Sequence, residues 1–371
     1  MRTEPLPGAR VVVGMSGGVD SSVAAALLVD RGFDVVGVTI KTYDYDDVGG
    51  NDAGESSCCS LDGITDARLV CDQLGIPHYV LDFSARFREQ IIDPFIDEYV
   101  AGRTPNPCVR CNRSIKWGHL LEKATALGAT HVAMGHYARL GHDAATGRVW
   151  VSRGRDRSKD QSYALWAVAQ EDLARTIFPL ADMTKDDARA YAVARGIRTA
   201  GKHESYEICF VHDNDYTRFL RDRVDGLDAR VRGGEVQFEG RVVGRHDGYP
   251  FYTIGQRRGL NVAVGEPVYV TEIRAGDNVI VVGREPDLLH TRCLVREVAM
   301  QKHPLPTAPL AVHARIRYKD EGAPAMLHPR DDGTIELVFD APRRAITPGQ
   351  STVWYEGDDV VGGGVIDQIL E

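Results

Sequence analysis

The stretch that decides the fold lies near the start of the chain and reads Gly14-Met15-Ser16-Gly17-Gly18-Val19-Asp20-Ser21-Ser22. An apolar run at 11–13 precedes it, and an apolar helical pattern at 23–28 follows it. A strand that passes through glycines and serines into a helix start presents backbone N–H groups, hydroxyls and the positive end of a helix dipole. The sequence therefore predicts a site for phosphate groups.

This loop is not a Walker A loop, because no Gly-Lys-Ser/Thr follows and no neighbouring lysine is placed to reach outer phosphates. The string Ser-Gly-Gly-x-Asp-Ser instead resembles the pyrophosphate loop of N-type ATP pyrophosphatases. That resemblance implies an enzyme that uses ATP to adenylate a carbonyl or carboxylate oxygen and releases pyrophosphate. The alternative is an ordinary glycine-rich turn between a strand and a helix.

The composition of the chain indicates a soluble globular protein of two or three domains, with 371 residues, 43% hydrophobic and 26% charged. No apolar stretch is long enough to span a bilayer, and the first residues lack the apolar core of a signal peptide. We therefore expect a cytoplasmic protein with no membrane partner. The net charge of −9 argues against non-specific coating of nucleic acid.

Two local patches are nevertheless basic. Arg153, Arg155, Arg157 and Lys159 crowd one segment. The residues 313, 315, 317 and 319 are His, Arg, Arg and Lys, and this period of two predicts one face of a strand. Each patch is either a nucleic-acid contact or a solvated charged face.

The first 200 residues alternate strand and helix patterns, which predicts an α/β fold with a doubly wound parallel sheet. Ligands of such sheets bind beyond the carboxyl ends of the strands, where the phosphate loop lies. Another helix is predicted after Thr184, with Asp187 completing a capping box. The expected strands are 11–13, 35–40, 79–83 and 131–135, and the expected helices are 20–31, 62–75, 84–101 and 112–127.

From about residue 231 onward the pattern changes to short strands separated by glycine and turn residues. Strands without intervening helices predict one or two small β domains. The expected strands are 233–238, 268–273, 279–283, 310–318, 335–339 and 352–355.

The seven cysteines form an odd set with no small-domain spacing, so they are expected to be thiols for chemistry, metal binding or packing. Cys111 is predicted at the start of a helix, with Arg103, Arg110 and Arg113 nearby. Both surroundings favour a thiolate, so Cys111 is a candidate nucleophile. Cys209 is a second candidate in a predicted loop, although spacing alone does not establish a pair.

Motifs along nearly the whole chain resemble, in order, those of the tRNA-specific 2-thiouridylases. They are the phosphate loop, Cys58-Cys59-Ser60, Thr104-Pro105-Asn106-Pro107 with Cys111-Asn112, Gly135-His136-Tyr137, Lys159-Asp160-Gln161-Ser162-Tyr163, Glu207-Ile208-Cys209-Phe210, Tyr252-Thr253-Ile254-Gly255-Gln256-Arg257 and Thr347-Pro348-Gly349-Gln350. Any one motif can arise by chance, but their joint order is specific.

The resemblance implies an ATP-pyrophosphatase domain over 1–212, a small central β-rich domain over 213–285 and a tRNA-binding C-terminal β-barrel over 286–371. It implies an enzyme, a tRNA-uridine 2-sulfurtransferase that adenylates the C2 oxygen of the wobble uridine. Sulfur then replaces that oxygen, and AMP and pyrophosphate leave. The implied cofactors are ATP and Mg²⁺. The implied partners are wobble-uridine tRNAs, such as those for Lys, Glu and Gln, and a sulfur donor protein of a cysteine desulfurase relay.

The resemblance also implies roles for single residues. Cys209 would carry a persulfide, and Cys111 would attack it and leave a Cys111–Cys209 disulfide to be reduced. Asp20 would act through magnesium. The ATP-binding positions are Gly14, Met15, Ser16, Gly17, Gly18, Val19, Asp20, Ser21, Ile40 and Gly135. The target-base positions are Asn106, Pro107 and Cys108, and the other tRNA positions are His136, Lys159, Asp160, Gln161, Arg317, Tyr318 and Gln350.

The chain departs from the family pattern at Cys108, where many members have aspartate. Cys108, Cys111 and Cys209 together form a set able to hold a [4Fe–4S] cluster with one open iron, which would give a cluster-dependent version of the same reaction. The other interpretation makes Cys108 a spectator or a resolving thiol. Cys58 and Cys59 are expected to serve packing.

Two other functions remain open at this point. A small-molecule synthetase with the same loop explains the first 40 residues, but not the two placed cysteines or the basic C-terminal strand. A non-catalytic RNA-binding module explains the basic strand but needs no ATP loop. A thiouridylase alone needs tRNA together with a sulfur source.

Overall fold

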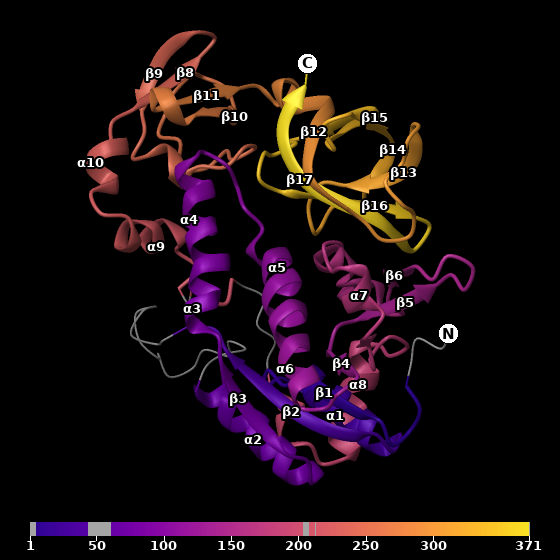
Figure 1. The fold of residues 1–371 in the computed structure, drawn as a ribbon. Helices are drawn as coiled ribbons and strands as arrows, with labels where there is room; N and C mark the ends of the chain where they lie inside the picture. Colours follow the sequence, from indigo (N-terminus) through magenta and orange to yellow (C-terminus); the bar gives the residue numbers. More distant parts are fainter. Residues whose placement is uncertain (1–4, 44–60, 203–207, 212, 371) are drawn as a thin grey trace.

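The structure is a computed structural model, and it describes residues 5–43, 61–202, 208–211 and 213–370. The chain forms a parallel sheet, a small four-stranded sheet and an eight-stranded sheet that contains a closed barrel. In Figure 1 the parallel sheet lies at the bottom and the barrel at the upper right, while α4 and α5 rise between them. The predicted class, α/β followed by β units, is confirmed.

The N-terminal sheet has the order β3-β2-β1-β4-β7, and all its pairings are parallel. Val11, Val13 and Val35 pack against α1, α2 and α8. Val12, Val36 and Val38 point the other way and pack with the helix that contains Trp117. Both faces are therefore covered, which confirms the doubly wound prediction. The strands are β1 (Arg10–Gly14), β2 (Asp34–Lys41), β3 (His78–Asp82), β4 (His131–Ala133) and β7 (Thr176–Ile177).

The helices of this unit follow the predicted positions with one correction. The helix expected from 112 begins at Pro107, because proline suits the first turn, where its missing N–H costs nothing. Cys111 therefore lies one turn inside the helix and opens a π-helical segment. The helices are α1 (Val19–Asp30), α2 (Leu61–Leu74), α3 (Ser84–Phe87), η2 (Arg88–Ile92, π), α4 (Asp93–Val100), α5 (Pro107–Arg110), η3 (Cys111–His119, π), α6 (Leu120–Ala126), α7 (Gln170–Leu173) and α8 (Lys185–Ala194).

The central unit is a four-stranded sheet of order β10-β11-β8-β9, preceded by two short helices. Its core is continuous with that of α3 and α4, since Phe95, Phe210, Phe219 and Ile280 belong to one buried cluster. The elements are α9 (Tyr216–Arg223), α10 (Leu227–Val231), β8 (Glu235–Phe238), β9 (Arg241–Arg245), β10 (Tyr269–Arg274) and β11 (Val279–Gly283).

The C-terminal unit is a six-stranded barrel, closed by pairing of β12 with β17. A hairpin, β5 (Ala138–His142) and β6 (Val149–Arg153), comes from the N-terminal unit and joins the barrel sheet at β17. The sequence analysis missed this hairpin. The barrel strands are β12 (Leu289–Met300), β13 (Leu310–Arg315), β14 (Ala323–Pro329), β15 (Ile335–Arg344), β16 (Ser351–Glu356) and β17 (Asp359–Leu370).

The predicted basic strand face is wrong beyond Arg315. β13 ends there, and Arg317 and Lys319 lie in the turn that follows. Arg315 directs its guanidinium to the carbonyl oxygens of Tyr318 and Asp320, so the turn folds back on the strand. The domain boundaries at 212/213 and 285/286 stay predictions.

Gly17 provides a test of how tightly the phosphate loop is packed. Its φ is +71°, and a Cβ there would lie 2.1 Å from the carbonyl oxygen of Gly63 in α2. Gly147 has the same φ of +71° but open space around its Cβ position. We expect Gly147→Ala to lower the free energy of unfolding by about 1 kcal/mol, the cost of a left-handed alanine. Gly17→Ala adds a backbone collision and should cost about 3 kcal/mol.

Urea unfolding of the two variants measures the difference. Equal losses of unfolding free energy in the two variants would show that α2 does not pack tightly against the loop. The comparison is matched, because both substitutions add one methyl group at the same backbone conformation.

Candidate active site

The phosphate loop is held closed by its own serines. The Ser21 hydroxyl lies 3.1 Å from that of Ser16 and accepts the Ser16 N–H at 3.2 Å. The Ser22 hydroxyl donates to the Gly18 carbonyl at 2.8 Å. Gly18 is the N-cap of α1 and has no side chain, so no cap side chain covers the first N–H groups of the helix. A helix start in this state is suited to an anion.

Neighbouring strands border the loop at the carboxyl edge of the sheet. The Met15 N–H donates to the Val38 carbonyl, and the Thr39 hydroxyl donates to the Met15 carbonyl, both at 2.8 Å. Gly135, just after β4, comes so close that a Cβ would lie 2.8 Å from the backbone of Asp20. The structure therefore places Ile40 and Gly135 on the same rim as 14–21.

Asp20 is engaged by protein side chains. The Lys185 ammonium lies 2.8 Å from both carboxylate oxygens, and the Tyr137 hydroxyl donates to one of them at 2.8 Å. Mg²⁺ at Asp20 would compete with this ion pair, so we assign no step to magnesium at Asp20. Lys185 was missed by the sequence analysis. A lysine at the first position of a helix opposes the helix dipole. This unfavourable placement was the signal in the sequence that Lys185 has a specific partner.

A second lysine reaches the loop from far along the chain. The Lys202 ammonium donates to the Gly17 carbonyl at 3.2 Å and pairs with Asp66 at 2.8 Å. The sequence places no lysine beside the loop, but the fold brings this one to it. Lys202 therefore supplies positive charge beside the loop.

The two candidate thiols face one hydrophobic cluster. Cys111 and Cys209 are half-buried, and both pack against the cluster that contains Tyr43 and Ile115. The Tyr43 hydroxyl donates to the Cys209 carbonyl at 2.9 Å. Since Ile40 packs against the same cluster, the end of β2 connects the rim of the phosphate loop with the thiols.

The arginines expected near Cys111 have other partners. Arg103 pairs with Glu98 and Asp367, and Arg110 lies 3.5 Å from Glu297. Arg113 is exposed. The guanidinium groups of Arg103 and Arg110 therefore organise the junction with the barrel.

Cys108 is exposed, and it lies close enough to Tyr318 to affect the pKa of that side chain. Burial raises the pKa of Tyr318, and the nearby charges of Asp160 and Cys108 add to that rise. Among the described residues, which include Cys108, Cys111 and Cys209, no group of three His, Cys, Asp or Glu side chains is placed to hold a metal ion. The cluster-ligand prediction does not fit this arrangement, and we derive no step through a cluster. Cys58 and Cys59 lie outside the described residues.

Several predicted tRNA positions meet at the junction of hairpin, sheet and barrel. Gln161 accepts the Tyr137 N–H at 3.0 Å, and the Tyr318 hydroxyl donates to the Asp160 carbonyl at 3.0 Å. The Asp160 carboxylate is nearly buried between Arg153 and Arg315, at 3.7 and 3.6 Å. Lys159 and Arg317 flank this group in sequence.

Gln350 lies apart from that group. It is next to the segment that leads into Asn106 and Pro107, where its side-chain amide donates to the Thr104 carbonyl at 2.9 Å. The predicted tRNA positions therefore fall into two places, one at Asp160 and one at Thr104.

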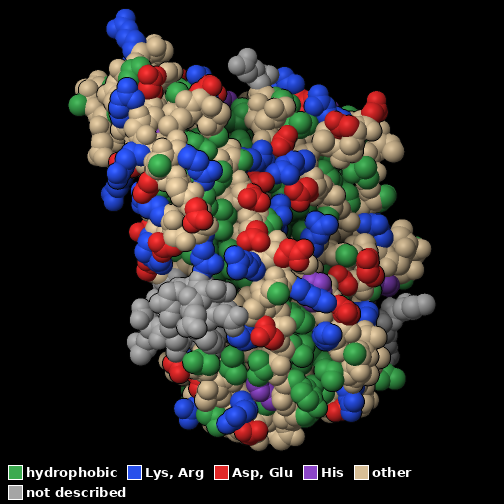
Figure 2. Space-filling view, turned by 60° about the vertical axis from the view of Figure 1, so that its left-hand side comes forward, with side chains coloured by type: hydrophobic (Ala, Val, Ile, Leu, Met, Phe, Trp, Pro, Cys, Tyr) green, Lys and Arg blue, Asp and Glu red, His purple; other side chains and the backbone are tan. Residues whose placement is uncertain are grey.

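The basic segment at 153–159 is balanced by acids. Arg153 lies near Asp160, Arg155 near Asp187 and Arg157 beside Asp358. On the face drawn in Figure 2, Lys and Arg side chains are interspersed with Asp and Glu rather than gathered in one field. The ion pairs of Arg153, Arg155 and Arg157 favour the interpretation of the segment as a paired charged face.

The surroundings of His136 favour its neutral form. Its ring lies among Trp117 and Phe178, and its Nδ1 is buried without a partner among the described residues. Burial lowers the pKa of His136 to about 3, and the charge of Lys116 adds to this effect. A neutral imidazole that follows β4 directly can accept or donate a hydrogen bond without adding charge.

This buried imidazole predicts a pH dependence of stability. Because the folded pKa of His136 lies below the unfolded value of 6.5, its stabilising contribution is complete above pH 6.5 and is lost as the pH falls toward 3. From pH 7 to pH 5 this group alone should lower the free energy of unfolding by about 2 kcal/mol. Urea unfolding at both pH values should show a correspondingly smaller decrease in the free energy of unfolding for His136→Asn. An equal decrease in both proteins would mean that His136 is charged when folded.

The described thiols should differ in reactivity. Cys71 and Cys293 are buried, and burial raises the pKa of each thiol to about 12, whereas Cys108 is exposed. Iodoacetamide at about pH 8 should therefore modify Cys108 first and leave Cys71 and Cys293 intact until the chain is unfolded. Peptide mass spectrometry with and without guanidinium measures this order. Early modification of Cys293 would contradict the closed barrel.

Three family models match successive parts of the chain. Residues 9–213 match the family described as tRNA methyl transferase HUP domain, 219–284 its PRC-barrel domain and 290–366 the aminomethyltransferase beta-barrel domain. A 4-thiouridine synthetase–RNA complex with bound ATP is a structural neighbour, with 17% identity, 59% of this chain and 51% of that chain covered and a TM-score of 0.37. No helix in the described part is long and apolar enough to cross a bilayer.

Full-length relatives give the family. A tRNA-specific 2-thiouridylase MnmA of Salinibacter ruber is 51% identical over 97% of this chain and 94% of its own length. One from Amoebophilus asiaticus is 50% identical over 96% and 95%. Neither a small-molecule synthetase nor a non-catalytic RNA module would give this similarity over all three units. The chain belongs to the tRNA-specific 2-thiouridylase family.

Proposed function

We propose that this chain is a tRNA-uridine 2-sulfurtransferase that converts the wobble uridine of its tRNA substrates to 2-thiouridine with ATP. The observation that carries the proposal is the link that β2 makes between the phosphate loop and the hydrophobic cluster against which the thiols pack. The phosphate loop is bonded to the end of β2, and Ile40 of β2 packs on the cluster that also receives Cys111 and Cys209. The family and the tRNA named for its members support the substrate.

The first half-reaction belongs to the phosphate loop. The uracil O2 attacks the α-phosphorus of ATP, the bond to the β-phosphate oxygen breaks, and pyrophosphate leaves. The start of α1 and Lys202 are suited to hold the pyrophosphate, because both present positive charge. The oxygen becomes part of an AMP leaving group.

The second half-reaction belongs to the thiols. A persulfide on Cys209 attacks the activated C2, and AMP leaves with the former O2. The Cys111 thiolate then attacks the Cys209 sulfur, breaks the S–S bond and leaves the outer sulfur on C2. The sulfane sulfur is reduced and the two thiols are oxidised to a disulfide, so an external dithiol must restore the enzyme. The persulfide source is a sulfur relay donor, and the compartment is the cytoplasm.

Serine variants of the two thiols test this proposal. With ATP, Mg²⁺, unmodified tRNA, cysteine and a cysteine desulfurase, the unaltered enzyme should form 2-thiouridine, measured by nucleoside mass spectrometry. Cys111→Ser and Cys209→Ser should each lower the rate by about 100-fold or more, and the double variant should be no worse, since the thiols act as one unit.

Cys293→Ala is the control, because Cys293 is buried in β12 away from this chemistry, and it should keep its activity. Substantial turnover by Cys209→Ser would exclude its persulfide role. Absence of 2-thiouridine with the unaltered enzyme would reject the function.

A further inference from the structure

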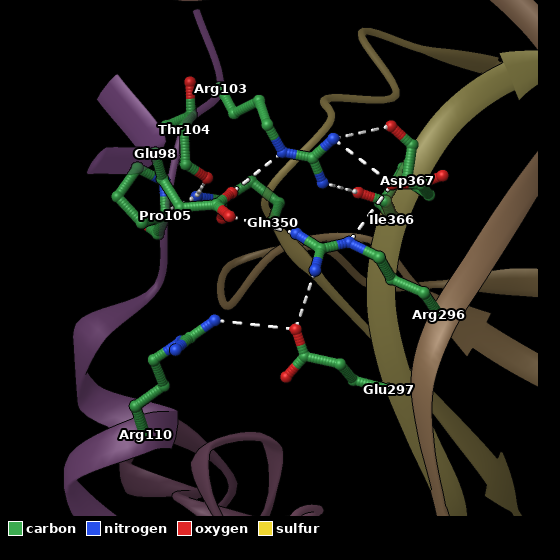
Figure 3. Close-up of polar contacts among 10 residues, drawn as sticks. All are labelled: Glu98, Arg103, Thr104, Pro105, Arg110, Arg296, Glu297, Gln350, Ile366 and Asp367. Atoms are coloured by element: carbon green, nitrogen blue, oxygen red, sulfur yellow. Dashed lines mark hydrogen bonds and ion pairs between the residues drawn. The ribbon is translucent and has the colours of Figure 1, made fainter. Parts of the chain in front are cut away.

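The segment that leads into the candidate catalytic helix is held by the barrel. Residues 103–106 form the last part of the connection from α4 to α5, and the Thr104 N–H donates to the Pro348 carbonyl at 2.9 Å. The Gln350 amide donates to the carbonyls of Thr104 and Pro105, at 2.9 and 3.3 Å. Figure 3 shows this side chain directed at the segment.

Gly349 makes that approach possible. Its φ is +92°, and a Cβ there would lie 2.8 Å from the Thr104 carbonyl oxygen. The two backbones therefore touch at a point where only glycine fits. This contact therefore forms only when the barrel and the segment are aligned as they are here.

Four charged side chains fasten the same junction (Figure 3). Arg103 pairs with Glu98 at 2.8 Å and with Asp367 of β17 at 3.2 Å. Arg296 of β12 pairs with the same two carboxylates, at 3.0 and 3.1 Å. We call these four residues, Glu98, Arg103, Arg296 and Asp367, the junction cluster.

The junction cluster is intact at neutral pH. Burial by itself would raise the pKa of Glu98, but the hydrogen bonds and charges of Arg103 and Arg296 lower it below its usual value. Glu98 is therefore ionised, and its two oxygens join an arginine of the catalytic unit to an arginine of the barrel.

A small, open pocket lies beside this junction. The catalytic side contributes Asn106, Arg110 and Arg113, and the barrel contributes Glu297, Gly349 and Ser351. Since both units form its wall, its shape depends on how the barrel holds the segment.

We propose that Gln350 and the junction cluster are positioning residues, through which the barrel sets the place of Asn106 and of the helix that carries Cys111. The proposal rests on the proposed function for what the segment does and adds a task for the barrel besides binding tRNA. In this proposal Gln350 binds the backbone of the segment. The family resemblance instead implies that Gln350 contacts tRNA directly.

Gln350→Ala and Arg103→Ala test the proposal against a matched control. Arg148 also docks on the barrel, through the carbonyls of Met300 and Gln301 at 2.7 and 2.8 Å, but does not touch the segment. We expect the first two variants to lower the single-turnover rate of thiolation about 10- to 100-fold, with the tRNA dissociation constant changed less than about threefold. Arg148→Ala should keep the rate, and Arg103→Lys should recover part of it.

Hydrogen exchange of the peptide that contains Thr104 gives a readout independent of activity. Its amide should exchange about tenfold faster in Gln350→Ala than in the unaltered protein or in Arg148→Ala. Loss of tRNA affinity with an unchanged rate would overturn the proposal and return Gln350 to RNA binding. An unchanged exchange rate in Gln350→Ala would also overturn it. If the unaltered protein makes no 2-thiouridine, the proposed function fails, and the exchange measurement still decides whether the barrel holds the segment.

Discussion

The parallel order β2-β1-β4 is the constraint on which the rest of the molecule depends. It brings the ends of three strands to one edge, where Met15 is bonded to β2 and Gly135 closes on Asp20. No single strand forms the site, because β1, β2 and β4 each contribute residues to only one side of it. Any sequence that preserved the loop but changed β2 would lose the connection from the phosphate loop to the cluster against which the thiols pack.

Charge near the loop is supplied by distant lysines in a chain that is acidic overall. Lys185 and Lys202 come from the end of the N-terminal unit, and each is held by an aspartate of the first helices. These ion pairs fix the ammonium groups in place, so the cations are already oriented toward the loop. The net charge of −9 does not reveal this, because only local placement matters to a phosphate group.

The sequence predicted what depends on local pattern. The parallel strands, the capping box of Thr184 and Asp187, and the all-β second half are confirmed. The helix expected from residue 112 begins earlier, because Pro107 suits the first helical turn.

The rest of the structure depends on long-range contacts that no local pattern contains. The β5–β6 hairpin pairs with a strand near the C-terminus, and the partners of Arg103 include residues of that same strand. The first strand of the hairpin, 138–142, has few apolar residues, so the sequence signal for a strand was weak. Lys202 is separated from Gly17 by 185 positions. Tertiary structure alone brings such groups together.

The shared sheet of hairpin and barrel also has a consequence for synthesis on the ribosome. Ser152 of β6 bonds to Asp359, which is translated 207 residues later. Until then the nascent chain exposes an unpaired strand edge, the kind of surface that invites intermolecular pairing. Premature termination anywhere before β17 would leave that edge open permanently, so truncated products should be prone to aggregation and to removal by chaperones and proteases.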